Sequence, residues 1–140
     1  MVKLPHTARS GCPINFGLEI FGDKWTFLIL RDLLIQGKKT FGEFQASEEG
    51  IASNVLSERL ARLEHSGLVK KQRDANDARQ FHYHATKAGS ALIPALMELS
   101  YWGAVHDPKT AAPPNFVKAY ESDREALLAA LTSGVDVTKG

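Results

Sequence analysis

The sequence predicts a mainly α-helical domain with one small β-hairpin. Apolar residues recur at helical spacing over most of the chain, and a short helix, a turn and a second amphipathic helix follow one another in its first half. Two strand-like stretches around a polar turn come next. The 140 residues are 44% hydrophobic and 24% charged, as in an ordinary folded domain. We expect residues 1–107 to form the main domain and residues 108–140 a linker and a C-terminal helix packed on it.

Two helices are predicted in the first 35 residues. An initial proline and apolar residues at helical spacing indicate a helix over residues 13–21. Asp23 is then placed to cap a second helix over residues 24–35, which Gly37 would end. Since this second helix is apolar on nearly all sides, we expect it to lie buried at the centre of the domain.

The next segment has the layout of a helix-turn-helix. Thr40 and Glu43 have the spacing of a capping box and predict a short helix. A loop over residues 47–50 leads to a helix over residues 53–65, whose inward face is formed by Leu56, Leu60 and Leu63. The outer face of that helix is polar, so the pair resembles a DNA-reading motif in outline.

A hairpin and further helices are predicted after it. Residues 68–72 and 80–86 have strand character, and the polar residues 73–79 between them form the turn of a wing. A long helix is expected over residues 87–106, bent or broken at Pro94, and a last helix over residues 116–131, ending at Gly134.

The apolar stripe of the helix over residues 87–106 is too wide for a small domain to bury alone. We therefore expect a homodimer, joined through this helix, the N-terminal helix and the C-terminal one. The alternative is that the last helix covers the stripe within one chain. The candidate interface residues are Leu92, Leu96, Leu99, Tyr101 and Trp102.

Charge is distributed unevenly along the chain, although the formal net charge is only +1. Residues 52–87 hold seven basic and four acidic side chains, whereas residues 1–51 are balanced and residues 98–140 are net acidic. A basic middle segment indicates a surface that faces an anion, and the alternative is an ordinary solvated face.

The order of short motifs resembles that of the HxlR-type transcriptional regulators. The resemblance runs over residues 11–106 and rests on Cys12-Pro13, Gly22-Asp23-Lys24-Trp25, Phe41-Gly42-Glu43-Phe44, Gly50-Ile51, Val55-Leu56-Ser57-Glu58-Arg59-Leu60, Gly67-Leu68-Val69, Thr86-Lys87-Ala88-Gly89 and Trp102-Gly103. It implies a homodimeric winged helix-turn-helix protein that binds double-stranded operator DNA and regulates transcription.

Three features depart from the family pattern. Ala52 stands where members usually have serine or threonine, so we expect Ser53 to cap the recognition helix instead. The wing tip, residues 74–79, is closer to the acidic and basic tip of MarR-type regulators. The segment after Asp107 is longer than the family core requires.

In this layout, the first turns of the helix over residues 53–65 would face the bases in the major groove. The candidate base readers are Ser53, Asn54, Ser57 and Glu58, and Asn54 has the geometry for a bidentate contact to adenine. Glu58 either accepts a hydrogen bond from cytosine or pairs with Arg62 one turn on. The alternative for this polar face is plain exposure to solvent.

Longer cations around this helix and on the wing are placed for phosphates. These candidates are Lys38, Lys39, Arg59, Arg62, Arg73 and Arg79. Arg79 would reach a phosphate or the minor groove, or else pair with Asp77 and shape the wing tip.

Cys12 is the single cysteine and precedes a helix that begins with Pro13. A helix N-terminus favours a thiolate, and Lys3, His6 and Arg9 are close in sequence. Regulators that resemble this family use a cysteine here to sense oxidants or electrophiles, so Cys12 is a candidate redox sensor. The alternative is a small buried thiol that only packs.

Other chemistry finds less support in the sequence. His82 and His84 lack a third ligand at suitable spacing, so no metal site is expected, and no catalytic or cofactor-binding motif is recognisable.

The N-terminus has no signal-peptide pattern and no apolar run could span a bilayer, so we expect a cytoplasmic protein. A small aromatic effector could lie among Phe16, Trp25, Tyr101 and Trp102, although core packing is the alternative for these rings. Two other functions stay open, an adaptor that binds a ligand or partner but not DNA, and a small enzyme.

Overall fold

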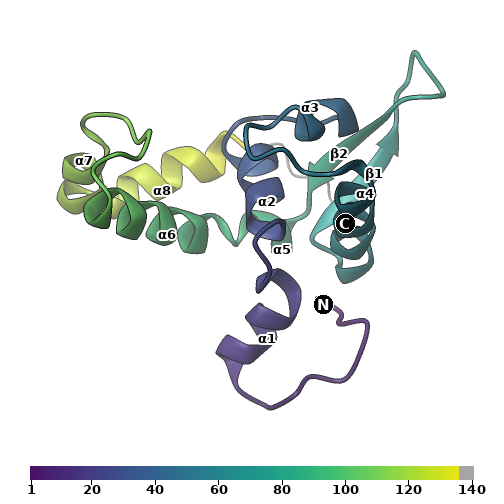
Figure 1. The fold of residues 1–140 in the computed structure, drawn as a ribbon, viewed down its shortest axis with the longest axis horizontal. Coiled ribbons are helices and arrows are strands. Elements are labelled where there is room, and N and C mark those ends of the chain that lie inside the picture. Colours follow the sequence, from purple (N-terminus) through teal and green to yellow (C-terminus); the bar gives the residue numbers. More distant parts are fainter. Residues whose placement is uncertain (136–140) are drawn as a thin grey trace.

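The computed structural model describes residues 1–135 and is mainly helical; residues 136–140, the end of the expected C-terminal segment, lie outside the described residues. In chain order the elements are α1 (Pro13–Phe21), α2 (Thr26–Leu34), α3 (Phe41–Gln45), α4 (Ser53–Ser66), β1 (Val69–Arg73), β2 (Phe81–Ala85), α5 (Lys87–Ser90), α6 (Ile93–His106), α7 (Phe116–Ser122) and α8 (Arg124–Ser133). Figure 1 shows a block of α2, α3, α4 and the hairpin, with α6, α7 and α8 forming an arm on one side and α1 projecting below. Within residues 1–135, no helix has the length and apolar character needed to cross a membrane.

The two helices predicted near the N-terminus are confirmed. Pro13 is the first residue of α1, where the missing amide proton costs nothing. Trp25 occupies the N-cap position of α2, and Asp23, two residues before it, binds the start of the helix: its Oδ1 accepts hydrogen bonds from the amides of Trp25 (2.9 Å) and Thr26 (3.0 Å). As expected, α2 is the central helix and buries Ile29, Leu30, Leu33 and Leu34.

The helix-turn-helix consists of α3 and α4. Thr40 Oγ1 accepts from the amide of Glu43 (3.2 Å), and Glu43 accepts from the amide of Thr40 (3.1 Å), which confirms the capping box. The inward face of α4 is also confirmed, since Leu56, Leu60 and Leu63 are at most 2% exposed. These three contacts hold α4 against the core and leave its opposite face in solvent.

The expected cap at Ser53 is wrong. Ala52 occupies the N-cap position of α4, and no side chain there accepts a hydrogen bond. Ser53 already lies inside the helix, one residue beyond the position from which a side chain caps it. The other end of α4 is closed by Gly67, whose φ of +85° is a left-handed conformation that favours glycine.

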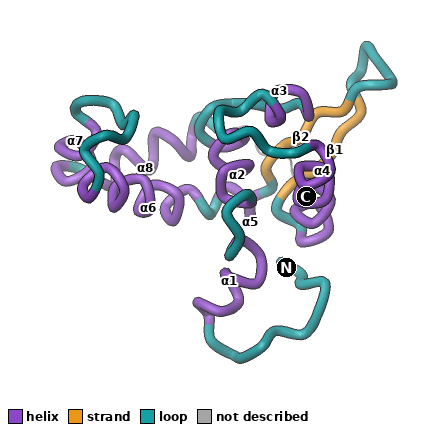
Figure 2. The backbone as a smooth tube through the Cα atoms, viewed as in Figure 1, coloured by secondary structure: helices purple, strands orange, loops and turns teal. Residues whose placement is uncertain are grey.

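The predicted hairpin is confirmed as an antiparallel pair of strands (Figure 2). Val69 lies opposite Ala85 and Arg73 lies opposite Phe81. Val69, Tyr83 and Ala85 are buried against the core, whereas residues 70–73 are exposed. The hairpin tip therefore projects beside α4, and together with α3 and α4 it makes the winged helix-turn-helix that the sequence predicts.

The two long helices expected after the hairpin are each divided. α5 ends at Ser90 and α6 begins at Ile93, so the break expected near Pro94 is confirmed, with Pro94 in the first turn of α6. The single helix expected over residues 116–131 is wrong. Asp123 leaves the helical conformation and accepts from the amide of Ala126 (3.0 Å), so it ends α7 and caps α8.

The C-terminal helices cover one side of α6. Tyr120 of α7 is buried, its ring stacks on Tyr101 with centroids 5.0 Å apart, and its hydroxyl donates to Glu98 (2.7 Å). The other side of α6 exposes Leu99, Trp102 and Val105. The last helices thus cover part of the apolar stripe within one chain, and part of it remains exposed.

Candidate nucleic-acid interface

The outer face of α4 presents short polar side chains. Ser53, Asn54 and Ser57 are all exposed. Asn54 lies opposite the leucines that hold the helix on the core, Ser57 lies beside that opposite face, and Ser53 is in the first turn of the helix. Their hydroxyl and amide groups can donate and accept hydrogen bonds, which is what contact with base edges requires. Since the helix is anchored along its length, these groups have a fixed position on the surface.

Glu58 on the same helix is held by two arginines. Arg62 donates to Glu58 Oε1 at 2.9 Å, one helical turn away, and Arg59 Nη1 also donates to this carboxylate. The pairing of Glu58 with Arg62 is therefore the alternative that the structure shows. Because both arginines compensate its charge, Glu58 adds little net negative charge to a face that would approach phosphates.

Arg59 is turned toward the protein. Its side chain is 21% exposed, and its Nε donates to Asp23 Oδ1 at 3.1 Å, at the corner between α1 and α2. Burial raises the pKa of Asp23, but hydrogen bonds from Thr26, the Trp25 amide and Arg59 outweigh that effect and lower it to about 2. Asp23 is thus ionised, and Arg59 serves an internal ion pair where a phosphate contact was expected.

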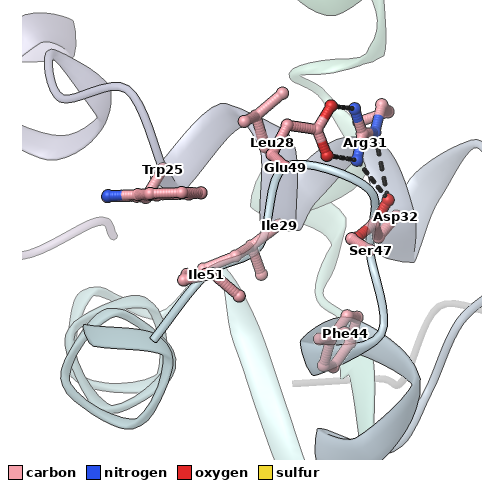
Figure 3. Close-up of a pocket in the computed structure, with 9 residues that line it drawn as sticks. All are labelled: Trp25, Leu28, Ile29, Arg31, Asp32, Phe44, Ser47, Glu49 and Ile51. Atoms are coloured by element: carbon pink, nitrogen blue, oxygen red, sulfur yellow. Dashed lines mark hydrogen bonds and ion pairs between the residues drawn. The ribbon is translucent and has the colours of Figure 1, made fainter. Parts of the chain in front are cut away.

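Lys38 also belongs to an internal network at the end of α2. Figure 3 shows the ion pairs of Arg31 with Asp32 and Glu49 in this network. Its Nζ donates to Ser47 Oγ (2.7 Å) and lies 3.7 Å from the buried carboxylate of Asp32. Arg31 donates to Asp32 (2.8 and 3.0 Å) and to both carboxylate oxygens of Glu49 (2.7 and 2.9 Å). These contacts fasten the turn between α3 and α4 to the end of α2.

The charges of this network stabilise one another. The hydrogen bonds from Arg31 lower the pKa of Glu49 to about 2, and those to Glu49 raise the pKa of Arg31 despite its partial burial. The charge pattern alone did not predict this network, although Arg31-Asp32 near the end of an apolar helix is a signal that could have indicated it.

Lys39 connects the helix-turn-helix to the wing through its backbone. Its amide donates to Glu43 (3.2 Å), and its carbonyl accepts from the amide of Tyr83 in β2 (2.7 Å). The side chain is half-buried. The backbone of this residue therefore fixes the distance between the capped end of α3 and the hairpin.

The wing tip is preorganised, and one cation projects from it. Asp74 accepts from the amides of Asn76 (2.7 Å) and Asp77 (2.9 Å), and these hydrogen bonds lower its pKa. Arg79 is 93% exposed, with its Nε 3.4 Å from Asp77 Oδ1. The structure therefore shows the pairing of Arg79 with Asp77 and leaves its side chain in solvent, so that contact with a phosphate or the minor groove stays a prediction.

Arg73 and two lysines of β1 give the wing a basic surface. Arg73 donates to the carbonyl of Ala78 and packs over the ring of Phe81. Lys70 and Lys71 are exposed on the same strand, and Lys71 lies 4.2 Å from the centre of the Phe81 ring. In the sequence these lysines are visible only as part of the basic segment charge, although the predicted strand over residues 68–72 is a signal that could have placed them on the wing.

Cys12 is exposed, at the N-cap of α1. The buried-thiol alternative is therefore wrong. The side chains of His6 and Arg9 both bind Glu19 of α1, and their hydrogen bonds lower the pKa of Glu19 to about 2. These two side chains are close to Cys12 in sequence, but both contact the carboxylate of Glu19, further along the helix.

The five candidate interface residues of the C-terminal region are buried to different degrees. Leu99 is 55% and Trp102 62% exposed, Leu92 and Tyr101 are half-buried, and Leu96 lies in the core at 7%. Leu96 therefore packs within its own chain and offers little area to a partner. Ile14, Phe16 and Leu18 of α1 are further exposed apolar residues.

One of the two histidines of β2 forms a contact within the hairpin. His82 pairs with Asp74 at 3.1 Å, which ties β2 to the wing tip. In the part of the chain that the structure describes, no three His, Cys, Asp or Glu side chains gather as metal ligands would.

Comparisons with known proteins agree with this geometry. An uncharacterised HTH-type transcriptional regulator of Mycobacterium tuberculosis, Rv3095, is 35% identical over 104 residues, which cover 74% of this chain and 65% of that protein. The matched region thus spans just under two thirds of the mycobacterial relative.

Solved structures show the same fold. The structure of PA1607, a proposed transcription factor, superposes with a TM-score of 0.68 at 33% identity and covers 75% of this chain and 73% of that one. The redox regulator HypR in its oxidised form gives 0.61 at 29% identity, covering 67% and 96%. The model of the HxlR-like helix-turn-helix family matches residues 20–110, from the end of α1 to just beyond α6, and we conclude that this chain belongs to that family of transcriptional regulators.

Proposed function

We propose that this protein binds operator DNA as a homodimer, with α4 in the major groove and the wing against the flanking backbone. The observation that carries the proposal is the outer face of α4, where exposed Ser53, Asn54 and Ser57 stand on a helix anchored by three buried leucines. A fixed helix with short hydrogen-bonding side chains in its first turns suits base readout. The exposed Arg79 at the wing tip suits phosphate contact.

Fluorescence anisotropy with the DNA upstream of the protein's own gene and with unrelated DNA tests this proposal. Asn54→Ala is expected to raise the operator Kd about 5- to 150-fold, the equivalent of ~1–3 kcal/mol for a bidentate base contact, and to leave unrelated DNA unaffected. Asn115→Ala, at the start of α7 in the arm, is the matched control and should change neither affinity.

Arg79→Gln tests the wing in the same assay. We expect it to weaken binding to both DNAs alike and to reduce the slope of log Kd against log salt by about 0.9, the value of one lost phosphate contact. If the wild-type protein shows no salt-dependent preference for the upstream DNA, the result favours the alternative function, an adaptor that binds a ligand or partner but not DNA, over the proposed one.

The second copy would use the apolar surface left open by the arm. Leu99 and Trp102 of α6 and the exposed residues of α1 support an interface that extends from α6 to the N-terminal helix. A symmetric dimer would place two α4 helices on half-sites about one helical turn apart, or a multiple of that distance. Sedimentation equilibrium measures whether the protein is dimeric at the concentrations of the binding assay.

An oxidant response through Cys12 is a second proposed property. The exposed thiol supports it, as does the similarity to HypR, whose structure is described as that of a redox regulator. With one cysteine per chain, oxidation by diamide would join two Cys12 thiols in an intersubunit disulfide, and diamide would take up both hydrogens.

The oxidant response is tested by operator binding with and without diamide, together with non-reducing electrophoresis. Wild type should change its affinity and form a covalent dimer, both reversed by dithiothreitol, whereas Cys12→Ser should do neither. An unresponsive wild type would contradict the sensor role and would leave operator binding itself unaffected.

A small aromatic effector also stays a proposal, tested by adding such molecules to the binding assay.

A further inference from the structure

An ion pair joins the middle of α4 to the corner between α1 and α2. Arg59 Nε lies 3.1 Å from Asp23 Oδ1, and the two side chains are 21% and 25% exposed. The residues are 36 positions apart in sequence, so the contact exists only because the fold brings α4 beside this corner. The Nη1 atom of Arg59 is engaged by Glu58 of the same helix.

Asp23 is itself held rigidly. In addition to Arg59, it accepts from the amides of Trp25 (2.9 Å) and Thr26 (3.0 Å) and from Thr26 Oγ1 (2.6 Å). Thr26 is only 1% exposed, so this group of contacts is anchored in the core. An ionised carboxylate with four donors has little freedom to follow a moving arginine.

The corner is also tight on the side of α1. A Cβ atom at Gly22 would lie 2.4 Å from the carbonyl oxygen of Leu18, so only glycine fits there. Immediately beside it, the rings of Phe21 and Phe27 stack with centroids 4.4 Å apart. The end of α1, the corner and the start of α2 therefore behave as one packed unit.

We propose that Arg59 is a positioning residue that sets the orientation of α4 through Asp23, rather than a contact to DNA phosphate. This inference rests on the proposed DNA binding. Leucines on the inward face of α4 hold it on the core, and the ion pair adds a polar restraint on rotation about the helix axis at the edge of that face. A guanidinium tied at its Nε to a fixed carboxylate restricts that rotation and so determines where the base-reading side chains point.

The roles of positioning and phosphate contact predict different binding data. If Arg59 acts through Asp23, then Arg59→Ala and Asp23→Asn each raise the operator Kd about 5- to 30-fold, and the double variant is no worse than either single one. The salt slope stays at the wild-type value, because no phosphate contact is lost. Arg59→Lys, which keeps a cation near Asp23, should recover affinity to within about threefold of wild type.

The controls come from the arm, which Figure 1 shows on the opposite side of the fold. Asp123 accepts a hydrogen bond from an amide at the start of α8, as Asp23 does from amides at the start of α2, and Arg124 pairs with Glu98 at 3.1 Å. Asp123→Asn and Arg124→Ala therefore match the two test substitutions in chemistry. Neither should change the operator Kd. The asparagine at position 23 keeps an oxygen for the two backbone amides, and thermal unfolding confirms that each variant is folded at the assay temperature.

Two results would overturn the inference separately from the proposed function. If Arg59→Ala reduces the salt slope by about 0.9 while Asp23→Asn leaves the Kd unchanged, Arg59 contacts phosphate and positioning is wrong. Additive losses in the double variant would also refute coupling through this pair. Failure of the wild-type protein to bind DNA would overturn the proposed function, and this inference with it.

Discussion

Replacing Leu60 by alanine removes the central contact between α4 and the core. Leu60 is 2% exposed, and its neighbours Leu56 and Leu63 on the same face are no more than 1% exposed. The substitution deletes three methyl-sized groups, which is about 2.4 kcal/mol of transfer free energy at ~0.8 kcal/mol each. The cavity left in a packed interior brings the expected loss of unfolding free energy to about 3–4 kcal/mol.

Urea unfolding followed by circular dichroism measures this loss. The protein concentration has to be held constant, because self-association would add to the apparent stability. We expect the melting temperature to fall by roughly 6–16 °C for a chain of this size. Glu64→Ala, on the exposed face of the same helix, is the matched control and should change the unfolding free energy by less than about 0.5 kcal/mol. A loss below about 1 kcal/mol for Leu60→Ala would refute the anchoring of α4 described above.

Three further predictions concern other parts of the molecule. Thr40→Ala removes the capping box of α3 and should lower the unfolding free energy by about 1 kcal/mol in thermal unfolding, whereas Thr40→Ser should keep most of it; equal stability of both variants would contradict the cap. Trp102→Ala removes the largest exposed ring of α6 and should raise the dimer dissociation constant at least tenfold by sedimentation equilibrium, and an unchanged constant would place the interface elsewhere. Asp23 has a pKa of about 2 in the folded protein against an ordinary value near 4, so its stabilising effect is complete above pH 4 and is lost as the pH falls toward 2. The stability difference between wild type and Asp23→Asn should shrink over that range in urea titrations, and a difference independent of pH would argue against an ionised, paired Asp23.

Local signals were sufficient for much of the fold. The capping box at Thr40 and the three leucines of α4 depend on residues only a few positions apart, and the structure has them as predicted. The first wing strand is displaced by one residue from the prediction and the second is one residue shorter at each end, because alternation marks a strand well and its ends poorly. The division at Asp123 was missed, although an aspartate followed by helix-forming residues is itself a capping signal.

The candidate site could be predicted only in part. The sequence shows which side chains are charged, but the fold determines which of them form ion pairs with each other. Lys38 and Arg59 have the length and charge of phosphate contacts, yet Asp32 and Asp23 bind them within the protein. Arg79 has the same chemistry and stays 93% exposed because its partner lies two residues away at the wing tip.

By itself, the sequence determined the family, the helix-turn-helix with its wing, and the outer face of α4, because these depend on periodicity and on hydrogen bonds between near neighbours. Only the tertiary structure decided which cations stay exposed and which form internal ion pairs, which part of α6 stays exposed, and that Leu96 packs in the core. Each of these depends on residues far apart in the chain, such as Arg59 with Asp23 and Tyr101 with Tyr120. A linear pattern shows that a side chain is charged or apolar, and packing alone determines what it contacts.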